Sequence, residues 1–267
     1  MRHIKLLLEY DGSNYQGWQS QKSGKTIQDI LRERIVSITG NQIRLAGASR
    51  TDAGVHALGQ VAAFSTNSDL SIDVLKRALN AKLPDNIRII TLEETDGTFN
   101  PRFDALKKRY IYLISMGRNE SAFLHKYRWQ MKASLDLEAM KEAALLLIGE
   151  HDFSSLRGSG CSAKTTVRQI HTLEVMALHA MEFMTVPIRG DYIKISVEAN
   201  AFLRHMVRNI VGTLVEVGKG KIAVEDISAL LNARDRTKAG PTAPAAGLFL
   251  EKVFYPVRDQ RSSNGVN

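Results

Sequence analysis

The chain has 267 residues, of which 44% are hydrophobic and 24% charged, a composition typical of a globular protein with one large domain or two lobes. Its one cysteine, Cys161, excludes an internal disulfide, and no apolar run approaches the roughly 20 residues that span a membrane, so we expect a cytoplasmic protein. The net charge of +8 favours a polyanionic partner, most commonly nucleic acid.

The first part of the chain predicts alternating strands and helices. Thr26 is a helix-capping residue, and apolar residues recur at helical spacing from there to Gly40. Pro84 stops a second apolar-faced helix. In order, we expect a strand (4–10), a helix (26–40), two strands (43–46 and 61–64), a helix (71–83) and a strand (87–92).

A second cycle of strands and helices begins after Asp104, where we place a boundary between an N-terminal lobe (1–104) and a C-terminal lobe (105–267). Gly190 and Asp191 are typical turn formers between two strands. We expect a strand (107–114), a helix (135–147), three strands (167–177, 182–188 and 192–199), two helices (202–217 and 224–231), a final strand (248–255) and a polar, disordered tail (258–267). The fold class is therefore α+β, with two lobes of mostly antiparallel or mixed sheet.

The segment Gly47–Gln60 is the most informative part of the sequence. It carries three glycines, which permit backbone conformations closed to other residues, and Asp52 is its only carboxylate. Arg50 lies two positions before that acid. A lone loop aspartate usually bonds to nearby backbone amides, but a glycine-shaped loop with one acid and a neighbouring cation indicates a site.

Two further segments carry cations beside apolar or aromatic residues. Tyr110 follows the triple cation 107–109 at the start of a strand, an arrangement that can hold a phosphate chain and stack a base. In the helix predicted over 202–217, Arg204 and Arg208 share a face. A solvated strand end and a solvated helix flank are the alternative interpretations.

The string S-R-T-D-A-G-V-H-A over 49–57 resembles the G-R-T-D-x-G-V-H-A loop of the tRNA pseudouridine synthases of the TruA type. Ser49 replaces the usual glycine, which we expect to leave the chemistry untouched. The strings F-L-R-H-M-V-R-N-I-V-G, from Phe202, and R-Y-I-Y, from Arg109, also match the family. The resemblance extends over about 4–255, nearly the whole chain.

The resemblance implies roles for five residues. Asp52 would be the catalytic carboxylate, Tyr110 would lie against the target uracil, and Arg208 would pair with Asp52. Arg50 would fill the space left by a flipped base or grip a phosphate, and Leu248 would pack near the active site, although a core position explains Leu248 equally well. No role carries over to Arg204, which falls at a variable position.

The resemblance also implies a pseudouridine-synthase-type fold with a central basic cleft, acting on uridines 38, 39 and 40 in the anticodon stem-loop of tRNA. The reaction is an isomerisation, so it needs no metal, redox cofactor or ATP. The partner would be tRNA, bound across a homodimer. The histidines and the cysteine show no metal-ligand spacing, which agrees with the absence of a metal from the expected mechanism.

Three rival functions remain at this point. A non-catalytic RNA-binding protein would share the charge and the aromatics without needing Asp52. An ATPase could use the segment Gly158–Thr165, which differs from a phosphate-binding loop by Ala163, although that motif needs a strand before it and a helix after it. An aspartate-dependent hydrolase would need a second carboxylate or a metal near Asp52.

Overall fold

The computed structural model describes residues 1–22, 24–117 and 121–256. Its helices are α1 (Ile27–Thr39), α2 (Ile72–Lys82), α3 (Leu137–Leu145), α4 (Met206–Gly218) and α5 (Asp226–Ala233), with short 3₁₀ turns η1 (Gly12–Asn14), η2 (Ser154–Leu156), η3 (Arg236–Lys238) and η4 (Ala245–Gly247). Its strands are β1 (Arg2–Tyr10), β2 (Ala46–Gly47), β3 (His56–Thr66), β4 (Ile87–Thr95), β5 (Lys107–Met116), β6 (Trp129–Met131), β7 (Gly149–Asp152), β8 (Val167–Phe183), β9 (Val186–Ala199) and β10 (Leu248–Phe254).

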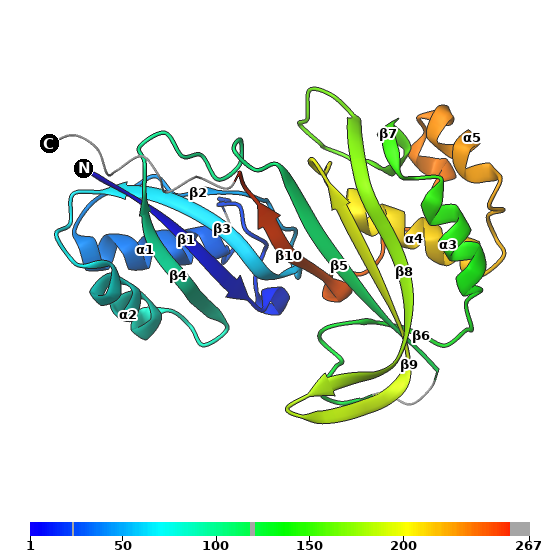
Figure 1. Ribbon diagram of the computed structural model, residues 1–267, viewed down its shortest axis with the longest axis horizontal. Coiled ribbons are helices and arrows are strands. Elements are labelled where there is room, and N and C mark those ends of the chain that lie inside the picture. The colour runs from blue at the N-terminus through cyan, green and yellow to red at the C-terminus, as the bar shows by residue number, and fades with distance from the viewer. Residues whose placement is uncertain (23, 118–120, 257–267) are drawn as a thin grey trace, which may run out of the picture.

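The strands of the described residues form one sheet in the order β4-β1-β3-β10-β5-β9-β8-β7, with β2 beside β3 and β6 beside β5. All pairs are antiparallel except β10 with β3 and β6 with β5. α1 and α2 lie beside the strands of the first half, and α3 to α5 beside those of the second (Figure 1). The α+β class predicted from the sequence is confirmed.

The last strand of the fold joins its two halves. β10 pairs along most of its length with β5, but in parallel with only His56 and Ala57 of β3. A single hydrophobic cluster includes buried residues from both halves. The division into lobes at 104 stays a prediction. None of the helices in the described part of the chain combines the length and apolarity needed to cross a membrane.

The local signals for the first helix are confirmed in detail. The Thr26 side chain accepts a hydrogen bond from the backbone N–H of Asp29 and donates to its carboxylate, a reciprocal cap. Gly40 ends the helix in the left-handed conformation, with φ of 69°. The apolar stripe packs inward, since Ile27 and Leu31 are fully buried.

The strands that flank the Asp52 segment differ from the prediction. The strand expected over 43–46 is reduced to the two residues of β2, and β3 begins at His56, five residues before the predicted start. Gly59 reads as part of a loop, yet it lies inside β3. A Cβ at Gly59 would come 2.4 Å from the carbonyl oxygen of Glu251, so this glycine lets β10 approach closely.

The three strands expected after 166 are two long strands, β8 and β9, and the predicted turn is wrong. The chain reverses at Met184 and Thr185, which have φ of 49° and 68°. Gly190 and Asp191 instead lie where the register of β8 against β9 shifts, opposite His179. Gly190 and Asp191 therefore form a bulge instead of a turn, because a bulge and a turn both need residues with the same backbone freedom.

Candidate active site

Asp52 lies on a tight turn between β2 and β3. The backbone N–H of Val55 donates to the carbonyl of Asp52 at 3.1 Å, and Gly54 has φ of 76° at the third position of this turn. That conformation favours glycine, which explains the glycine of the motif. The Asp52 side chain is 23% exposed, so the carboxylate is accessible to a substrate.

The loop after β1 fixes the shape of the turn from one side. The backbone N–H of Trp18 donates to the carbonyl of Thr51 at 3.0 Å, and the buried indole ring lies against Gly47. Gly17 has φ of 86°, and a Cβ there would come 2.5 Å from the Thr51 carbonyl oxygen. The Gly17-Trp18 pair is therefore a support for the Asp52 loop.

The buried side-chain amide of Gln60 binds the backbone of the Asp52 loop. Gln60 is fully buried, its Nε2 donates to the carbonyl of Ser49 at 2.7 Å, and its Oε1 accepts from the N–H of Ser49 at 3.2 Å. The hydroxyls of Tyr10 and Thr51 are 2.8 Å apart. These contacts satisfy the polar groups that a buried loop would otherwise leave without partners.

Tyr110 is brought under the same loop by β5. It is 5% exposed, its hydroxyl lies 2.7 Å from the Ser49 hydroxyl, and its ring meets Phe202 edge-on at 5.1 Å. Burial raises the pKa of the Tyr110 phenol well above its usual range, the Ser49 hydrogen bond opposes this, and the Asp52 charge adds to it. Ser49 therefore contacts the Tyr110 hydroxyl directly, a contact that the usual glycine could not make.

Arg208 meets Asp52, as the resemblance implies. Its Nη1 donates to Oδ2 of Asp52 at 3.4 Å, and its side chain is 16% exposed. His205 approaches the same oxygen, with its Nε2 at 3.6 Å. The predicted helix start at 202 is wrong, because His205 has φ of 59° and α4 begins only at Met206.

The chain between η3 and η4 fixes the direction of the Arg208 side chain. Nε of Arg208 donates to the carbonyl of Ala243 at 2.7 Å, and the N–H of Ala243 donates to the carbonyl of Arg208 at 3.1 Å. The segment crosses α4 at Gly212, where a Cβ would come 1.6 Å from the Pro241 oxygen. The buried Asn209 accepts hydrogen bonds from Arg236 and from the Thr242 hydroxyl.

Arg50 lines a groove beside the Asp52 loop. It is exposed and makes no hydrogen bond or ion pair with Asp52 among the described contacts, so the expected support of the carboxylate charge falls to Arg208 and not to Arg50. Arg50 lines a groove of about 400 Å³ together with Arg44, Arg102 and the ion-paired Arg32. We call this the arginine groove.

Leu248, the remaining predicted site residue, is buried with 4% exposure and belongs to the main hydrophobic core. It begins β10 opposite Tyr112, whose hydroxyl donates to the carbonyl of Pro244 at 2.8 Å. The core explanation therefore applies to Leu248, and its expected place near the active site stays a prediction.

The segment Gly158–Thr165 lacks the setting of a phosphate-binding loop. It follows the 3₁₀ turn η2 and leads into the strand β8, whereas the motif requires a preceding strand and a following helix. A short strand, β7, was not expected over 149–152, but η2 separates it from the loop. The segment instead contacts the chain just before α4, since the backbone N–H of Gly158 donates to the Arg204 carbonyl at 2.8 Å.

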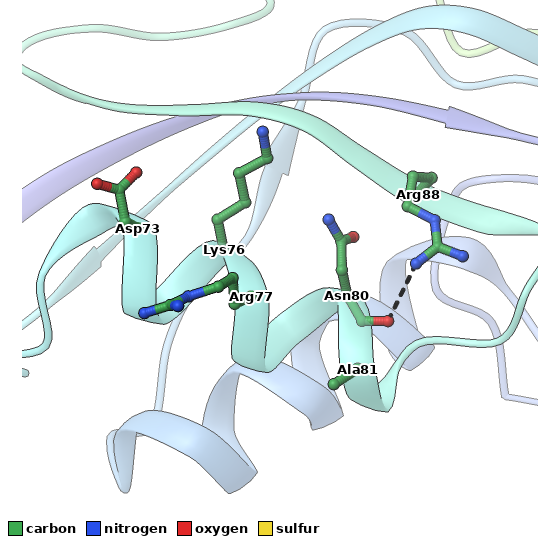
Figure 2. Close-up of a pocket in the computed structure, with 6 residues that line it drawn as sticks. All are labelled: Asp73, Lys76, Arg77, Asn80, Ala81 and Arg88. Atoms are coloured by element: carbon green, nitrogen blue, oxygen red, sulfur yellow. Dashed lines mark hydrogen bonds between the residues drawn. The ribbon is translucent and has the colours of Figure 1, made fainter.

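A second basic hollow lies between α2 and the start of β4. It measures about 690 Å³, and Figure 2 shows the cations Lys76, Arg77 and Arg88 around it, with Asp73 at one end. The Arg88 guanidinium donates to the Asn80 carbonyl at 3.2 Å. None of the residues lining this hollow belongs to the Asp52 loop, so we do not assign the chemistry to it.

Sequence reasoning missed two groups that touch the candidate site. His205 stands three positions before Arg208 in a quoted string, but no period or charge pattern separates it from a helix histidine. Gln60 reads as an ordinary polar residue after the loop. Both are identified only by position in the fold, since their partners are 153 and 11 residues away.

The chain matches known proteins over nearly all of its length. The sequence profile of a family described as tRNA pseudouridine synthase matches residues 7–104 and 143–256. The tRNA pseudouridine synthase A of Thermodesulfovibrio yellowstonii is 43% identical over 255 residues, and that of Acetivibrio thermocellus is 46% identical over 255 residues. Each match covers 96% of this chain and 100% of the relative. The chain therefore belongs to the tRNA pseudouridine synthase family, whose members are isomerases.

Proposed function

We propose that this chain isomerises uridine to pseudouridine in the anticodon stem-loop of tRNA, at positions 38, 39 and 40, with Asp52 as the catalytic carboxylate. The observation that carries the assignment is the accessible Asp52 carboxylate, paired with Arg208. The shape of its loop is maintained by hydrogen bonds with Trp18, Gln60 and Tyr10. Family membership supplies the substrate class.

The reaction requires the N1–C1′ bond of uridine to break and a C5–C1′ bond to form after the uracil has turned. The hydrogen leaves C5 as a proton, and N1 gains a proton, so the change is an isomerisation. Asp52 can attack C1′ as a nucleophile, or it can remove the C2′ proton to give a glycal. Both routes need a negatively charged carboxylate, which the adjacent Arg208 guanidinium stabilises.

A stacked uridine must be flipped out of the RNA to reach Asp52. We assign Arg50 to the vacated space or to a neighbouring phosphate, since it is exposed beside the Asp52 loop. We assign Tyr110 either to stacking on the uracil or to accepting the C5 proton. Burial raises the pKa of the Tyr110 phenol, so the hydroxyl loses its proton less readily than a free phenol, as it must before it can accept one from C5, which favours the stacking role.

The anticodon arm, the cytoplasmic location and a homodimer that shares one tRNA also belong to this proposal. They rest on the similarity to the proteins named tRNA pseudouridine synthase A and on the +8 charge of the chain. The expectation that no metal or cofactor takes part rests on the isomerisation chemistry itself.

The test is release of tritium from C5-labelled uridine in unmodified tRNA, because C5 loses its hydrogen when it becomes the glycosidic carbon. We expect release by the wild type without added metal or nucleotide, and none by Asp52→Ala, which should still bind tRNA. Release by a clean Asp52→Ala preparation would refute the catalytic assignment. Tight tRNA binding without any release by the wild type would indicate a non-catalytic RNA-binding protein.

Tyr110→Phe separates the two roles of the tyrosine, because it keeps the ring and removes the hydroxyl. Unaltered release would leave stacking as the role. Loss of release with retained tRNA binding would indicate proton transfer.

A further inference from the structure

The two oxygens of the Asp52 carboxylate have different surroundings. Arg208 Nη1 and His205 Nε2 both approach Oδ2, at 3.4 Å and 3.6 Å. No hydrogen bond from the described residues reaches Oδ1. One oxygen of the carboxylate therefore accepts a hydrogen bond from Arg208 and faces His205 at 3.6 Å, while the other is left to a substrate.

His205 is held in place by an unusual backbone and by a glycine. Its φ of 59° is left-handed, a conformation that histidine tolerates better than most residues but that persists only where the surroundings enforce it. Its ring lies against Gly158, where a Cβ would come 2.8 Å from Nδ1 and 2.9 Å from Cγ. Any side chain at position 158 would displace the imidazole.

The groups around His205 determine its charge. Asp52 faces it from the catalytic loop, Arg204 and Arg208 from its own segment, and Arg236 from η3. Burial lowers the pKa of the imidazole from its ordinary value, Asp52 opposes this, and the three arginines add to it. A neutral imidazole with its proton on Nε2 directs an N–H toward Oδ2 without adding a second positive charge, and a small approach from the observed 3.6 Å would make that contact a hydrogen bond.

We propose that His205 is a positioning residue that, with Arg208, holds Oδ2 of Asp52 so that Oδ1 is the oxygen that reacts with the ribose. Anchoring one oxygen fixes the rotation of the carboxylate and leaves the other free to act. In the nucleophilic route Oδ1 forms a bond to C1′ as the N1–C1′ bond breaks, and that Oδ1–C1′ bond breaks again when C5 joins C1′. In the elimination route Oδ1 takes the C2′ proton and returns it when C5 joins C1′. The inference rests on the proposed role of Asp52.

Two variants test the ring and its support separately. His205→Asn removes the imidazole and keeps a residue that tolerates the left-handed backbone. Gly158→Ala keeps His205 but places a methyl group against its ring, and the φ of Gly158 is not left-handed, so alanine fits the backbone. His179→Asn, at a side chain that is 89% exposed, is the matched control.

We expect each active-site variant to slow single-turnover tritium release by roughly tenfold to a hundredfold at saturating enzyme. The Kd for tRNA should stay within about twofold of the wild type, and His179→Asn should match the wild type. The double variant should be no slower than the slower single variant, because both act through one contact. An unchanged melting temperature shows that the fold is intact.

The pH profile separates positioning from a merely structural role. Protonation gives His205 a positive charge that binds Oδ2 more strongly and withdraws negative charge from the carboxylate. The wild-type rate should therefore fall as the pH drops through the pKa of His205, which burial places below the ordinary imidazole value, and His205→Asn should lose that decline. Additive losses in the double variant, or a decline that persists in His205→Asn, would overturn the inference.

The outcomes also distinguish this inference from the proposed function. No release by the wild type would refute the proposed function. Normal release by the wild type, with both variants equal to it at every pH, would refute only the positioning role. A raised Kd with an unchanged saturated rate would show that His205 contacts RNA instead of positioning Asp52.

Discussion

Arg208 joins two parts of the site through one side chain. Its Nε donates to the Ala243 carbonyl while its Nη1 reaches Asp52, so one planar guanidinium links the catalytic loop to the segment that crosses α4. A lysine carries a single ammonium and cannot span both acceptors. We expect Arg208→Lys to reduce single-turnover release by about a hundredfold or more and to leave the melting temperature nearly unchanged.

The control for this change is Arg234→Lys, at an exposed guanidinium that pairs with Asp152. This variant should behave as the wild type. If Arg208→Lys released tritium at the wild-type rate, the two-ended contact would have no role in the reaction.

The residues that carry a family motif were predictable, and those that depend on the fold were not. The sequence placed Asp52, Tyr110 and Arg208 together, because each stands in a recognisable string. It did not show the contact of Ser49, since nothing in the loop sequence indicates that β5 brings the Tyr110 hydroxyl within 2.7 Å of the Ser49 hydroxyl. That Ser49 leaves the chemistry untouched stays a prediction. The spacing of two residues likewise did not show that Arg50 lines the arginine groove and makes no ion pair with Asp52 among the described residues.

At the scale of elements, the hairpin of β8 and β9 is built on an unfavourable turn. Met184 and Thr185 both have positive φ, a backbone conformation that is unfavourable for residues with a Cβ. Asn-Gly is the pair that such a two-residue turn prefers. We expect the double change Met184→Asn and Thr185→Gly to raise the free energy of unfolding by about 1–2 kcal/mol in urea denaturation.

Thr185→Ala is the matched control, because it shortens the side chain and keeps the Cβ. It should bring no comparable gain. Met184 is 82% exposed, so its loss removes little buried surface. A double variant as stable as the wild type would mean that the hairpin tip does not limit stability.

The same hairpin shows why element boundaries were harder to predict than element types. Alternating apolar residues correctly indicated strands, but the choice between a turn and a bulge at Gly190 depends on pairing with His179 on the other strand. The start of β3 was missed for a similar reason, since its first residues are paired on both sides, with β1 and with β10. Such pairings join distant segments and leave no periodic trace in the local sequence.

At the scale of the whole molecule, we expect the location of the cations to matter more for tRNA binding than the net charge of +8. The arginine groove includes Ala46 and Gly47 of β2 beside its arginines, which places it next to the Asp52 loop. The hollow on α2 also carries cations, Lys76, Arg77 and Arg88, but none of its lining residues belongs to the Asp52 loop (Figure 2). If tRNA is bound around Asp52, cations in the groove should contact its phosphates and those on α2 should not.

We therefore expect the double change Arg44→Gln and Arg102→Gln to weaken tRNA binding by Asp52→Ala protein, which cannot turn the substrate over. Each lost phosphate contact lowers the slope of log K against log salt by about 0.7–0.9, so the pair should lower it by about 1.5. Both arginines are exposed, so the fold should tolerate the change.

Lys76→Gln with Arg77→Gln removes the same charge from the α2 hollow and is the matched control. Equal weakening by both pairs would mean that the total charge of the protein attracts tRNA and that no particular groove guides it. An unchanged slope in the groove variant would exclude phosphate contacts at Arg44 and Arg102. A change confined to the groove variant would place the RNA backbone along the arginine groove, because that groove includes the β2 residues that lead into the Asp52 loop.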